Sequence, residues 1–330
     1  MKKFIIPLFL VLLLCACTEK EETVQLFSMD TVMDIKVYGD RNSEAISAAE
    51  EEIYRIEKLL DRGSEESDIY RLNNGQYDIS EETKELLQML LKTSMKTDGA
   101  FDITVAPVMD LWGFYSDEYR IPEKSELENA LKSVNYRNVV MSETGIKVLN
   151  NARIDLGGAG KGYATDRVVK IFKDYNIKSA IINLGGNVYA HGKRYDNKQW
   201  RVGITNPFDS TAEALTIDVT DKAVVTSGGY HRNFEKDDKE YHHIINPQTG
   251  YPAQSDIKSV TVINPSATVA DAYSTALFVM GKEKAIEFLI NNTGVDAIII
   301  TEDKTVYYTA PLSGSISVKN GFCEKEISAE

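Results

Sequence analysis

The sequence predicts an α+β fold, with mixed or antiparallel sheets and flanking helices. Apolar residues at helical spacing and segments rich in β-branched residues both occur, but they do not alternate as they do in a doubly wound sheet. The 330 residues show no internal repeat at a fixed period and no low-complexity linker after residue 25. The chain is therefore expected to bury a sizeable core in one large domain or two intimate lobes.

The N-terminus is expected to be an export signal rather than part of the fold. Two lysines precede the apolar run Phe4–Leu14, which is too short to span a bilayer. The run ends in Leu-Cys-Ala-Cys, which resembles a bacterial lipobox with cleavage before Cys17; an ordinary secretory signal is the alternative. We expect a signal peptide over 1–16, a tether over 17–25 that begins with the lipidated Cys17, a domain over 26–325 and a tail over 326–330.

Charge and cysteine content exclude two classes of protein. The formal net charge is −13, and removal of Lys2 and Lys3 with the signal would leave −15. Such an acidic chain repels phosphate backbones, so we expect no nucleic-acid partner, and an anionic ligand would need local cations. Cys323 would have only the lipidated Cys17 as a partner, so we expect a fold without disulfides.

Helices and strands are expected in irregular order through the first half of the chain. Ser43 is the expected N-cap of the first helix, Ser80 opens the second, and Ser125 and Glu128 form an expected capping box for the third. In chain order, we expect extended segments over 24–38, a helix over 43–61, helices from Ser80 and Ser125, short strands over 139–154 with a turn at 143–145, a helix over 161–175 and a buried strand over 179–184.

Strand signals dominate the second half of the chain. Short runs rich in Val, Ile, Thr and Tyr are separated by polar residues. We expect strands over 200–205, 215–219, 223–227, 258–264, 295–301 and 305–310, with one helical insert over 267–292.

A glycine-rich loop, Asp-Leu-Gly-Gly-Ala-Gly-Lys-Gly-Tyr-Ala-Thr-Asp over 155–166, precedes a helical segment. It fails the Walker pattern, because Asp155 stands where the first glycine is needed and Gly162 where a Ser or Thr is needed. It also fails the dinucleotide fingerprint, because its last three glycines are evenly spaced. The glycines would still let a ligand or metal approach the backbone, with Lys161 supplying positive charge. The alternative is a tight strand-to-helix connection with an incidental lysine.

Two further polar clusters are candidates for a site. Asp271 and Thr275 lie at i and i+4, on one face of a helix, with Ser274 adjacent; these hard oxygen donors suit Mg²⁺. The alternative is a Thr275 that bonds backbone and an Asp271 near a helix N-terminus. The pair His242 and His243 offers one general-base candidate, although a packed or surface histidine is the commoner case.

The segment Asp98–Phe114 is mostly core in character. Its Gly-Ala-Phe-Asp turn carries Asp102, and Trp112 follows. These two residues suggest a slot for a flat ring as an alternative to simple packing.

Taken together, these stretches resemble the ApbE family, the FAD:protein FMN transferases. The similar blocks follow in order over nearly the whole mature chain: SMDTVMDIKVYG, TDGAFDITVAPVMDLWGF, IDLGGAGKGYATD, INLGGNVYAHG, WRVGITNP, TSGGY, HIINPQTGYP and SVTVI with ADAYSTALFVMG. The resemblance implies a two-lobed catalytic domain related to the T-fold, in an exported lipoprotein. It also implies Mg²⁺-dependent transfer of FMN from FAD, through a phosphoester, to a Thr or Ser of an exported acceptor protein, with release of AMP.

The resemblance also implies three sets of site residues. FAD would contact Met29, Ala100, Phe101, Asp102, Asp155, Lys161 and Ile245. Mg²⁺ would be held by Asp271, Thr275, the Gly158 carbonyl and, at a further position, Ser274. His243 would accept the proton of the acceptor hydroxyl, and Lys161 would add positive charge beside the phosphates.

This sequence departs from the family pattern at three places. Asp30 stands where glycine is usual, Asn246 replaces an aspartate, and Arg62 or Gly63 falls near a ligand-facing position that is often Tyr, Asn or Ser. The last departure bears on the balance between transfer and hydrolysis. Three other functions stay open: an FAD pyrophosphatase that yields FMN and AMP, a non-catalytic FAD-binding lipoprotein and a metal-free structural lipoprotein.

Overall fold

A computed structural model describes residues 20–116, 118–142, 145–230 and 232–328. Its centre is a nine-stranded sheet in which neighbouring strands are antiparallel except for the last pair, β14 and β16. In spatial order the strands are β1 (Glu21–Ser28), β2 (Thr31–Tyr38), β5 (Ser179–Leu184), β6 (Asn187–Gly192), β9 (Lys222–Gly228), β12 (Ile257–Asn264), β13 (Asp296–Thr301), β14 (Thr305–Thr309) and β16 (Cys323–Ile327). The predicted α+β class is confirmed.

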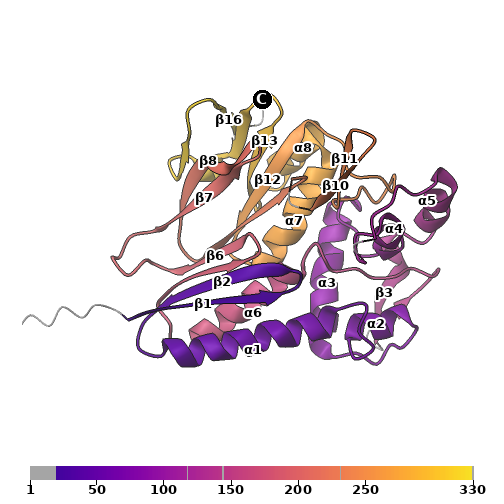
Figure 1. Ribbon diagram of the computed structural model, residues 1–330, viewed down its shortest axis with the longest axis horizontal. Coiled ribbons are helices and arrows are strands. Elements are labelled where there is room, and N and C mark those ends of the chain that lie inside the picture. Colours follow the sequence, from indigo (N-terminus) through magenta and orange to yellow (C-terminus); the bar gives the residue numbers. More distant parts are fainter. Residues whose placement is uncertain (1–19, 117, 143–144, 231, 329–330) are drawn as a thin grey trace, which may run out of the picture.

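Helices cover one face of this sheet and gather at one end of the molecule (Figure 1). The helices are α1 (Asn42–Leu60), α2 (Asp68–Asn73), α3 (Glu81–Lys96), α4 (Ala106–Trp112), α5 (Lys124–Leu131), α6 (Gly160–Asp174), α7 (Ala267–Met280) and α8 (Lys282–Asn291), with 3₁₀ turns η1 (Tyr136–Asn138) and η2 (Ala310–Leu312). Figure 1 shows α2, α4 and α5 together beyond the end of the sheet, beside the hairpin of β3 (Val139–Ser142) and β4 (Gly145–Val148).

Both faces of the central sheet are buried. A three-stranded sheet of β7 (Trp200–Asn206), β8 (Asp209–Val219) and β15 (Ile316–Val318) packs on the face opposite the helices. In β13, Ile299 faces the core under the helices, while Ile298 and Ile300 face the core between the sheets. Because side chains alternate along a strand, burial on both faces explains the continuous apolar run of β13.

Two predicted helix caps are wrong. Arg41, not Ser43, precedes α1, and the Ser43 hydroxyl donates to the Glu22 carboxylate of β1 at 2.7 Å. The capping box of α5 is formed by Glu123 and Glu126, because the helix begins at Lys124 and so encloses the predicted cap Ser125. The predicted cap of α3 is confirmed: the Ser80 hydroxyl accepts from the Thr83 N–H at 3.2 Å.

Several elements differ from the expected ones. The predicted helix over 267–292 is two helices, separated at Gly281, whose φ of 77° is left-handed. The short α2, α4 and β6, and a hairpin of β10 (Asn233–Lys236) and β11 (Lys239–His242), were not expected. Helix α2 carries only six residues, fewer than two turns, so its apolar spacing gives little signal.

The ends of the chain also differ from the expected boundaries. Strand β1 begins at Glu21, inside the expected tether, and β16 extends to Ile327, past the expected end of the domain. The charged side chains of β16 are exposed at the edge of the sheet, as is typical of edge strands. Because these residues are charged, the sequence alone made this strand look like a polar C-terminal tail.

Several predictions lie outside the described residues. They include the signal peptide, the lipid on Cys17 and the turn residues 143–144. Among the helices that the structure describes, none has the length and apolar composition needed to cross a membrane.

Candidate active site

Helices α6 and α7 cross closely beside the glycine-rich loop. A Cβ atom on Gly162 would lie 2.4 Å from the Ala267 carbonyl oxygen, so only glycine permits this approach. The Asp166 carboxylate then caps the start of α7, where it accepts from the backbone N–H of Ala267 at 2.7 Å and of Thr268 at 3.0 Å. The loop therefore fixes α7 in place, and this structural role of Gly162 and Asp166 was not predicted from the sequence.

The predicted metal ligands come together at this crossing. The Asp271 carboxylate accepts from the Gly162 N–H at 2.9 Å. Gly158 lies beside Thr275, because a Cβ on Gly158 would be 3.6 Å from the Thr275 hydroxyl oxygen. Ser274 is fully buried, and its hydroxyl donates to the Asp271 backbone carbonyl at 2.8 Å.

Ser227, at the end of β9, joins this cluster. Its hydroxyl oxygen lies 2.8 Å from that of Ser274 and 3.4 Å from that of Thr275. Ser227 is not among the site residues predicted from the sequence. The available signal was its position in the Thr-Ser-Gly-Gly-Tyr block, where a hydroxyl stands at the end of a strand before two glycines.

The charge of Asp271 suits a bound cation. Burial raises the pKa of this carboxyl, while the positive charge of Lys161 and the Gly162 N–H oppose the rise. A buried carboxylate is costly unless a cation or several donors compensate it. Within the described ranges, no three His, Cys, Asp or Glu side chains gather as a metal cage. The Asp271 carboxylate, the Thr275 hydroxyl and the Gly158 carbonyl are hard oxygen donors, and they fit Mg²⁺ because this ion takes few protein ligands and completes its shell with water or phosphate.

Asp155 is held by an arginine rather than left free. Its Oδ1 accepts from the Gly157 N–H at 2.8 Å, and its Oδ2 lies 2.8 Å from Nε of Arg62. The Arg62 side chain is only 8% exposed, and its Nη1 also pairs with Asp110 at 2.7 Å. The ring of Tyr115 covers the guanidinium at 3.8 Å.

Gly63 lies next to this arginine and against the end of the Tyr115 side chain. A Cβ there would lie 2.0 Å from the Tyr115 hydroxyl oxygen. At Arg62, where the sequence departs from the family pattern, the structure therefore has a cluster of charged side chains that includes Asp155, a predicted FAD contact.

Phe101 and Asp102, two further predicted FAD contacts, lie in different surroundings. The ring of Phe101, the residue after Ala100, lies close to Gly158. A Cβ added to Gly158 would lie 3.2 Å from this ring. The buried Asp102 accepts from the Thr104 hydroxyl at 2.6 Å and from the Tyr136 N–H at 2.8 Å. Burial raises the pKa of Asp102, and these bonds oppose the rise. Its side chain thus has a structural task, and its contact with FAD stays a prediction.

Met29 lies in the turn between β1 and β2, where it packs against the core that also contains Phe101. Its backbone N–H donates to the Glu57 carboxylate of α1 at 2.7 Å. Met29 and Asp30 have φ of 50° and 58°, left-handed values that favour glycine and explain why glycine suits the position of Asp30.

His243 follows β11 and is partly buried. Its Nδ1 lies 3.1 Å from the Arg232 carbonyl. Because a carbonyl only accepts, Nδ1 carries the hydrogen and Nε2 keeps a lone pair. Burial lowers the pKa of His243 to about 3, and Lys161 contributes to the lowering, so the ring is neutral at physiological pH. This tautomer can accept a proton at Nε2.

Trp112 and Ile245 belong to one small core. Trp112 is fully buried and donates from Nε1 to the Gly250 carbonyl at 2.7 Å, so the suggested slot for a flat ring is a packed core instead. Ile245 is buried in the same cluster and pairs with Pro252. Asn246, in place of the usual aspartate, still accepts from the Gln248 N–H at 2.9 Å through its side-chain oxygen.

The fold and this cluster define a class of α+β proteins. In this class, a glycine-rich loop and a buried helix, here α7, bring hard oxygen donors together at one site. The model described as the ApbE family matches residues 29–299. The chain therefore belongs to the ApbE family.

Curated relatives and solved structures support this assignment. A protein of Treponema pallidum named FAD:protein FMN transferase is 33% identical over 314 residues, which cover 87% of this chain and 86% of the relative. The ApbE protein of Thermotoga maritima is 33% identical with a TM-score of 0.81, over 91% and 97% of the two chains. The flavinyl transferase ApbE of Pseudomonas stutzeri is 26% identical with a TM-score of 0.77, over 86% and 92%.

Proposed function

We propose that this chain transfers FMN from FAD to a Thr or Ser hydroxyl of an acceptor protein, through a phosphoester bond, with release of AMP. The observation that carries the proposal is the meeting of Asp271, Thr275 and Gly158, with Lys161 close enough to affect both Asp271 and His243. Relatives named FAD:protein FMN transferase supply the substrate and the kind of acceptor.

The reaction is a displacement at the FMN-side phosphorus of FAD. The acceptor oxygen forms the new P–O bond while the bond to the bridging pyrophosphate oxygen breaks, and AMP leaves with that oxygen. His243 takes the hydroxyl proton at Nε2, the atom that its bond to the Arg232 carbonyl leaves unprotonated. Lys161 stabilises the charge that develops on the phosphoryl oxygens.

Mg²⁺ is expected at Asp271, Thr275 and the Gly158 carbonyl, with Ser274 nearby. When bound, it would neutralise pyrophosphate charge. The chain itself positions these groups. The Gly162 N–H orients the Asp271 carboxylate, and the Ser227 hydroxyl orients the hydroxyls of Ser274 and Thr275.

The location is part of the proposal. A lipid on Cys17 would anchor the domain to the outside of the bacterial cell membrane, as the lipobox-like sequence indicates. The acceptor would then be an exported protein.

One assay separates the alternatives. The protein is incubated with FAD, Mg²⁺ and a candidate exported acceptor, and the mixture is resolved on a denaturing gel. Fluorescent flavin that stays on the acceptor supports the transferase. Free FMN with AMP would instead identify a pyrophosphatase that uses water in the same site, and unchanged FAD would identify a binding protein.

A further inference from the structure

The chain enters the fold within a few residues of the proposed lipid anchor. Lys20 is the first residue that the structure describes, and β1 begins at Glu21. An extended chain covers at most about 3.6 Å per residue, so the steps from Cys17 to Glu21 span at most about 14 Å. With a lipid on Cys17, the start of β1 therefore lies within this distance of the bilayer.

Strand pairing places several other segments at this end of the sheet. Tyr38, at the end of β2, pairs with Glu21 and with Ser179, and Ser179 pairs with Gly192 at the end of β6. A Cβ atom on Gly192 would lie 1.9 Å from the Lys178 carbonyl oxygen. Figure 1 shows the start of α1 and the connection from β6 to β7 at this same end, opposite α5.

We call this end the anchor-side surface and define it by Lys20, Lys178 and residues 193–198. It would be the part of the folded domain next to the bilayer.

The connection from β6 to β7 is a tight turn with an exposed aromatic residue. It reads Lys-Arg-Tyr-Asp-Asn-Lys over 193–198. The Asn197 N–H donates to the Arg194 carbonyl at 2.9 Å. Tyr195 is 56% exposed, and the centre of its ring lies 5.0 Å from that of Tyr38. A tyrosine that has an apolar ring and a polar tip suits the headgroup level of a bilayer.

Basic side chains exceed acidic ones in this turn. Asp196 is shared by Arg194, at 2.9 Å, and Lys198, at 3.6 Å. Lys193 is exposed, and it forms no ion pair with any residue that the structure describes. The turn therefore presents a net positive charge to the solvent.

Two further lysines add to this charge. Lys20 and Lys178 are exposed, and neither has an ion pair in the described part of the chain. Asp40 and Asp221 are the exposed carboxylates at this end that lack an ion pair among the described residues. Because the chain as a whole carries −13, an anionic bilayer repels most of the molecule and attracts this end.

The candidate active site lies at the other end of the same strands. Strand β6 runs from Asn187, whose side chain bonds to Asp271, to Gly192 at the anchor-side surface. Strand β1 runs from that surface to Ser28, next to Met29, a predicted FAD contact. A strand rises about 3.3 Å per residue, so β1 separates the two ends by about 25 Å. Contact of the anchor-side surface with a bilayer would thus place the site away from the membrane.

We infer that the anchor-side surface lies on an anionic lipid bilayer and holds the candidate active site on the far side of the domain. This inference rests on the proposed location, which requires a lipid on Cys17. Lys20, Lys178 and Lys193 attract the lipid phosphates, and Tyr195 lies among the headgroups.

The test compares the accessibility of lysines on two membranes. The full chain is processed and lipidated in a bacterial host and then reconstituted into nanodiscs. One set of nanodiscs contains phosphatidylglycerol and phosphatidylcholine in equal amounts, and the other contains phosphatidylcholine alone. A water-soluble acylating reagent labels the lysines, and mass spectrometry measures the labelled fraction at each.

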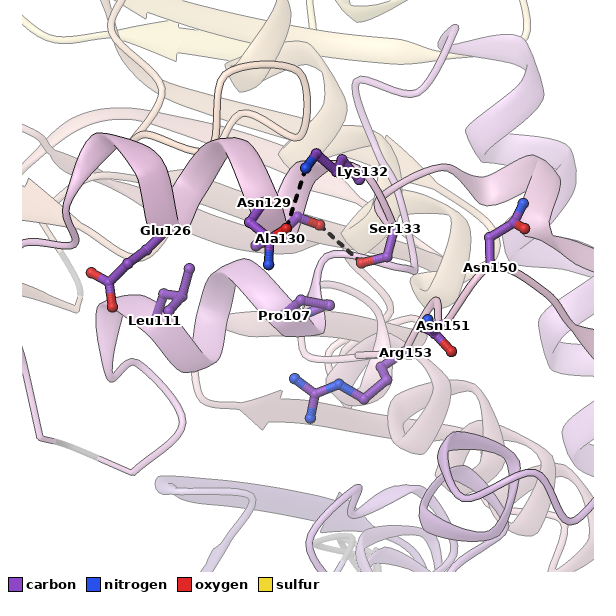
Figure 2. Close-up of a pocket in the computed structure, with 10 residues that line it drawn as sticks. All are labelled: Pro107, Leu111, Glu126, Asn129, Ala130, Lys132, Ser133, Asn150, Asn151 and Arg153. Atoms are coloured by element: carbon purple, nitrogen blue, oxygen red, sulfur yellow. Dashed lines mark hydrogen bonds between the residues drawn. The ribbon is translucent and has the colours of Figure 1, made fainter.

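We expect labelling of Lys178 and Lys193 to be about threefold lower on the anionic nanodiscs than on the neutral ones, a difference that high salt reduces. Lys132 is the internal reference, because it lies at the opposite end of the molecule. Figure 2 shows it beside Asn129, at the pocket between α4 and α5. Its labelling should be equal on the two membranes.

A pair of charge-reversal variants tests the role of the basic side chains. Lys193→Glu should raise the labelling of Lys178 on the anionic nanodiscs to its level on the neutral ones. Lys124→Glu is the matched control, because it makes the same charge change at an 82% exposed side chain of α5. It should leave the protection of Lys178 unchanged.

The outcomes are distinct. Protection of Lys178 that is lost in Lys193→Glu and kept in Lys124→Glu supports the inference. Equal labelling of Lys178 on the two membranes, or equal behaviour of the two variants, overturns it. Intact mass measured before reconstitution shows whether Cys17 carries a lipid: a chain without lipid would refute the proposed location and this inference with it. Failure of flavin transfer would appear separately, because no step of this test depends on it.

Discussion

At the scale of single residues, the site depends on charges that the fold buries and only partly compensates. Asp271 is buried beside the Gly162 N–H, the charge of Lys161 and the side chain of Asn187, whereas Asp155 is paired with Arg62. The buried Asp271 therefore stays the predicted metal ligand, whereas the ion pair with Arg62 favours a structural or ligand-orienting task for Asp155.

Asp271→Asn tests the metal assignment. The amide oxygen can still accept from the Gly162 N–H, so the fold should be retained, but the negative charge is lost. We expect the Mg²⁺-dependent rate of FMN transfer to fall about 10²–10³-fold, with little change in the melting temperature. An unchanged transfer rate at limiting Mg²⁺ would show that Asp271 does not bind the metal.

Arg62→Met tests the buried charge cluster. Removing the guanidinium leaves Asp155 and Asp110 without their shared cation, so we expect a loss of about 2–4 kcal/mol in the free energy of unfolding and weaker FAD binding. Denaturant unfolding and quenching of FAD fluorescence measure the two effects. Arg137→Met is the control, because that side chain is 65% exposed and lies 3.7 Å from Asp98; a loss as large there would argue against a special role for Arg62.

At the scale of elements, the junction of α6 and α7 determines where the predicted metal ligands lie. Gly162 allows the close approach, and Asp166 caps α7, so the orientation of Asp271 and Thr275 depends on α6 as much as on α7. A second link, from Glu52 of α1 to Arg167 of α6 at 2.7 Å, fixes α6 against its neighbour.

Gly162→Ala should destabilise this junction. The added methyl would meet the Ala267 carbonyl at 2.4 Å, so α7 must move, and we expect a loss of about 1–3 kcal/mol in the free energy of unfolding together with reduced Mg²⁺ affinity. Gly160→Ala is a matched control in the same helix, because nothing lies within 4 Å of its added methyl. Equal stability of the two variants, measured by denaturant unfolding, would refute the packing argument.

Glu52 should make the stability of the molecule depend on pH. The bond from Arg55, with a further one from Arg167, lowers the pKa of Glu52 from 4.5 to about 2. A carboxyl whose pKa is lower in the folded state stabilises the fold above pH 4.5, and this contribution is lost as the pH falls towards 2.

We therefore expect Glu52→Gln to cost about 1–2 kcal/mol in the free energy of unfolding at neutral pH, a value moderated by the partial exposure of Arg55 and Arg167. The difference from the wild type should shrink below pH 4.5. A difference that stays constant down to pH 3 would contradict this linkage.

At the scale of the whole molecule, the fold brings distant parts of the sequence to one site. Periodicity predicted most long elements, because helix α1 and strand β13 carry regular or continuous apolar patterns. It missed α2 and the exact start of α5, because short helices and their caps depend on tertiary contacts rather than on spacing alone.

The candidate site was predicted unevenly for the same reason. The position of Asp271 and Thr275 on one face of α7 follows from their spacing of four residues, which is a local pattern. The bond from Gly162 to Asp271 and the contact of Ser227 with Ser274 join residues far apart in the chain, and no local pattern encodes them. Arg62 was visible as a departure from the family pattern, but its ion pairs with Asp155 and Asp110 required the structure.

The proposed function requires that one FMN is transferred to the acceptor for each FAD consumed. The most direct measurement counts AMP by chromatography and acceptor-bound flavin by intact mass spectrometry in the same reaction. We predict equal amounts of the two products, with the acceptor mass raised by one FMN less water. AMP accompanied by free FMN, with the acceptor mass unchanged, would contradict the account.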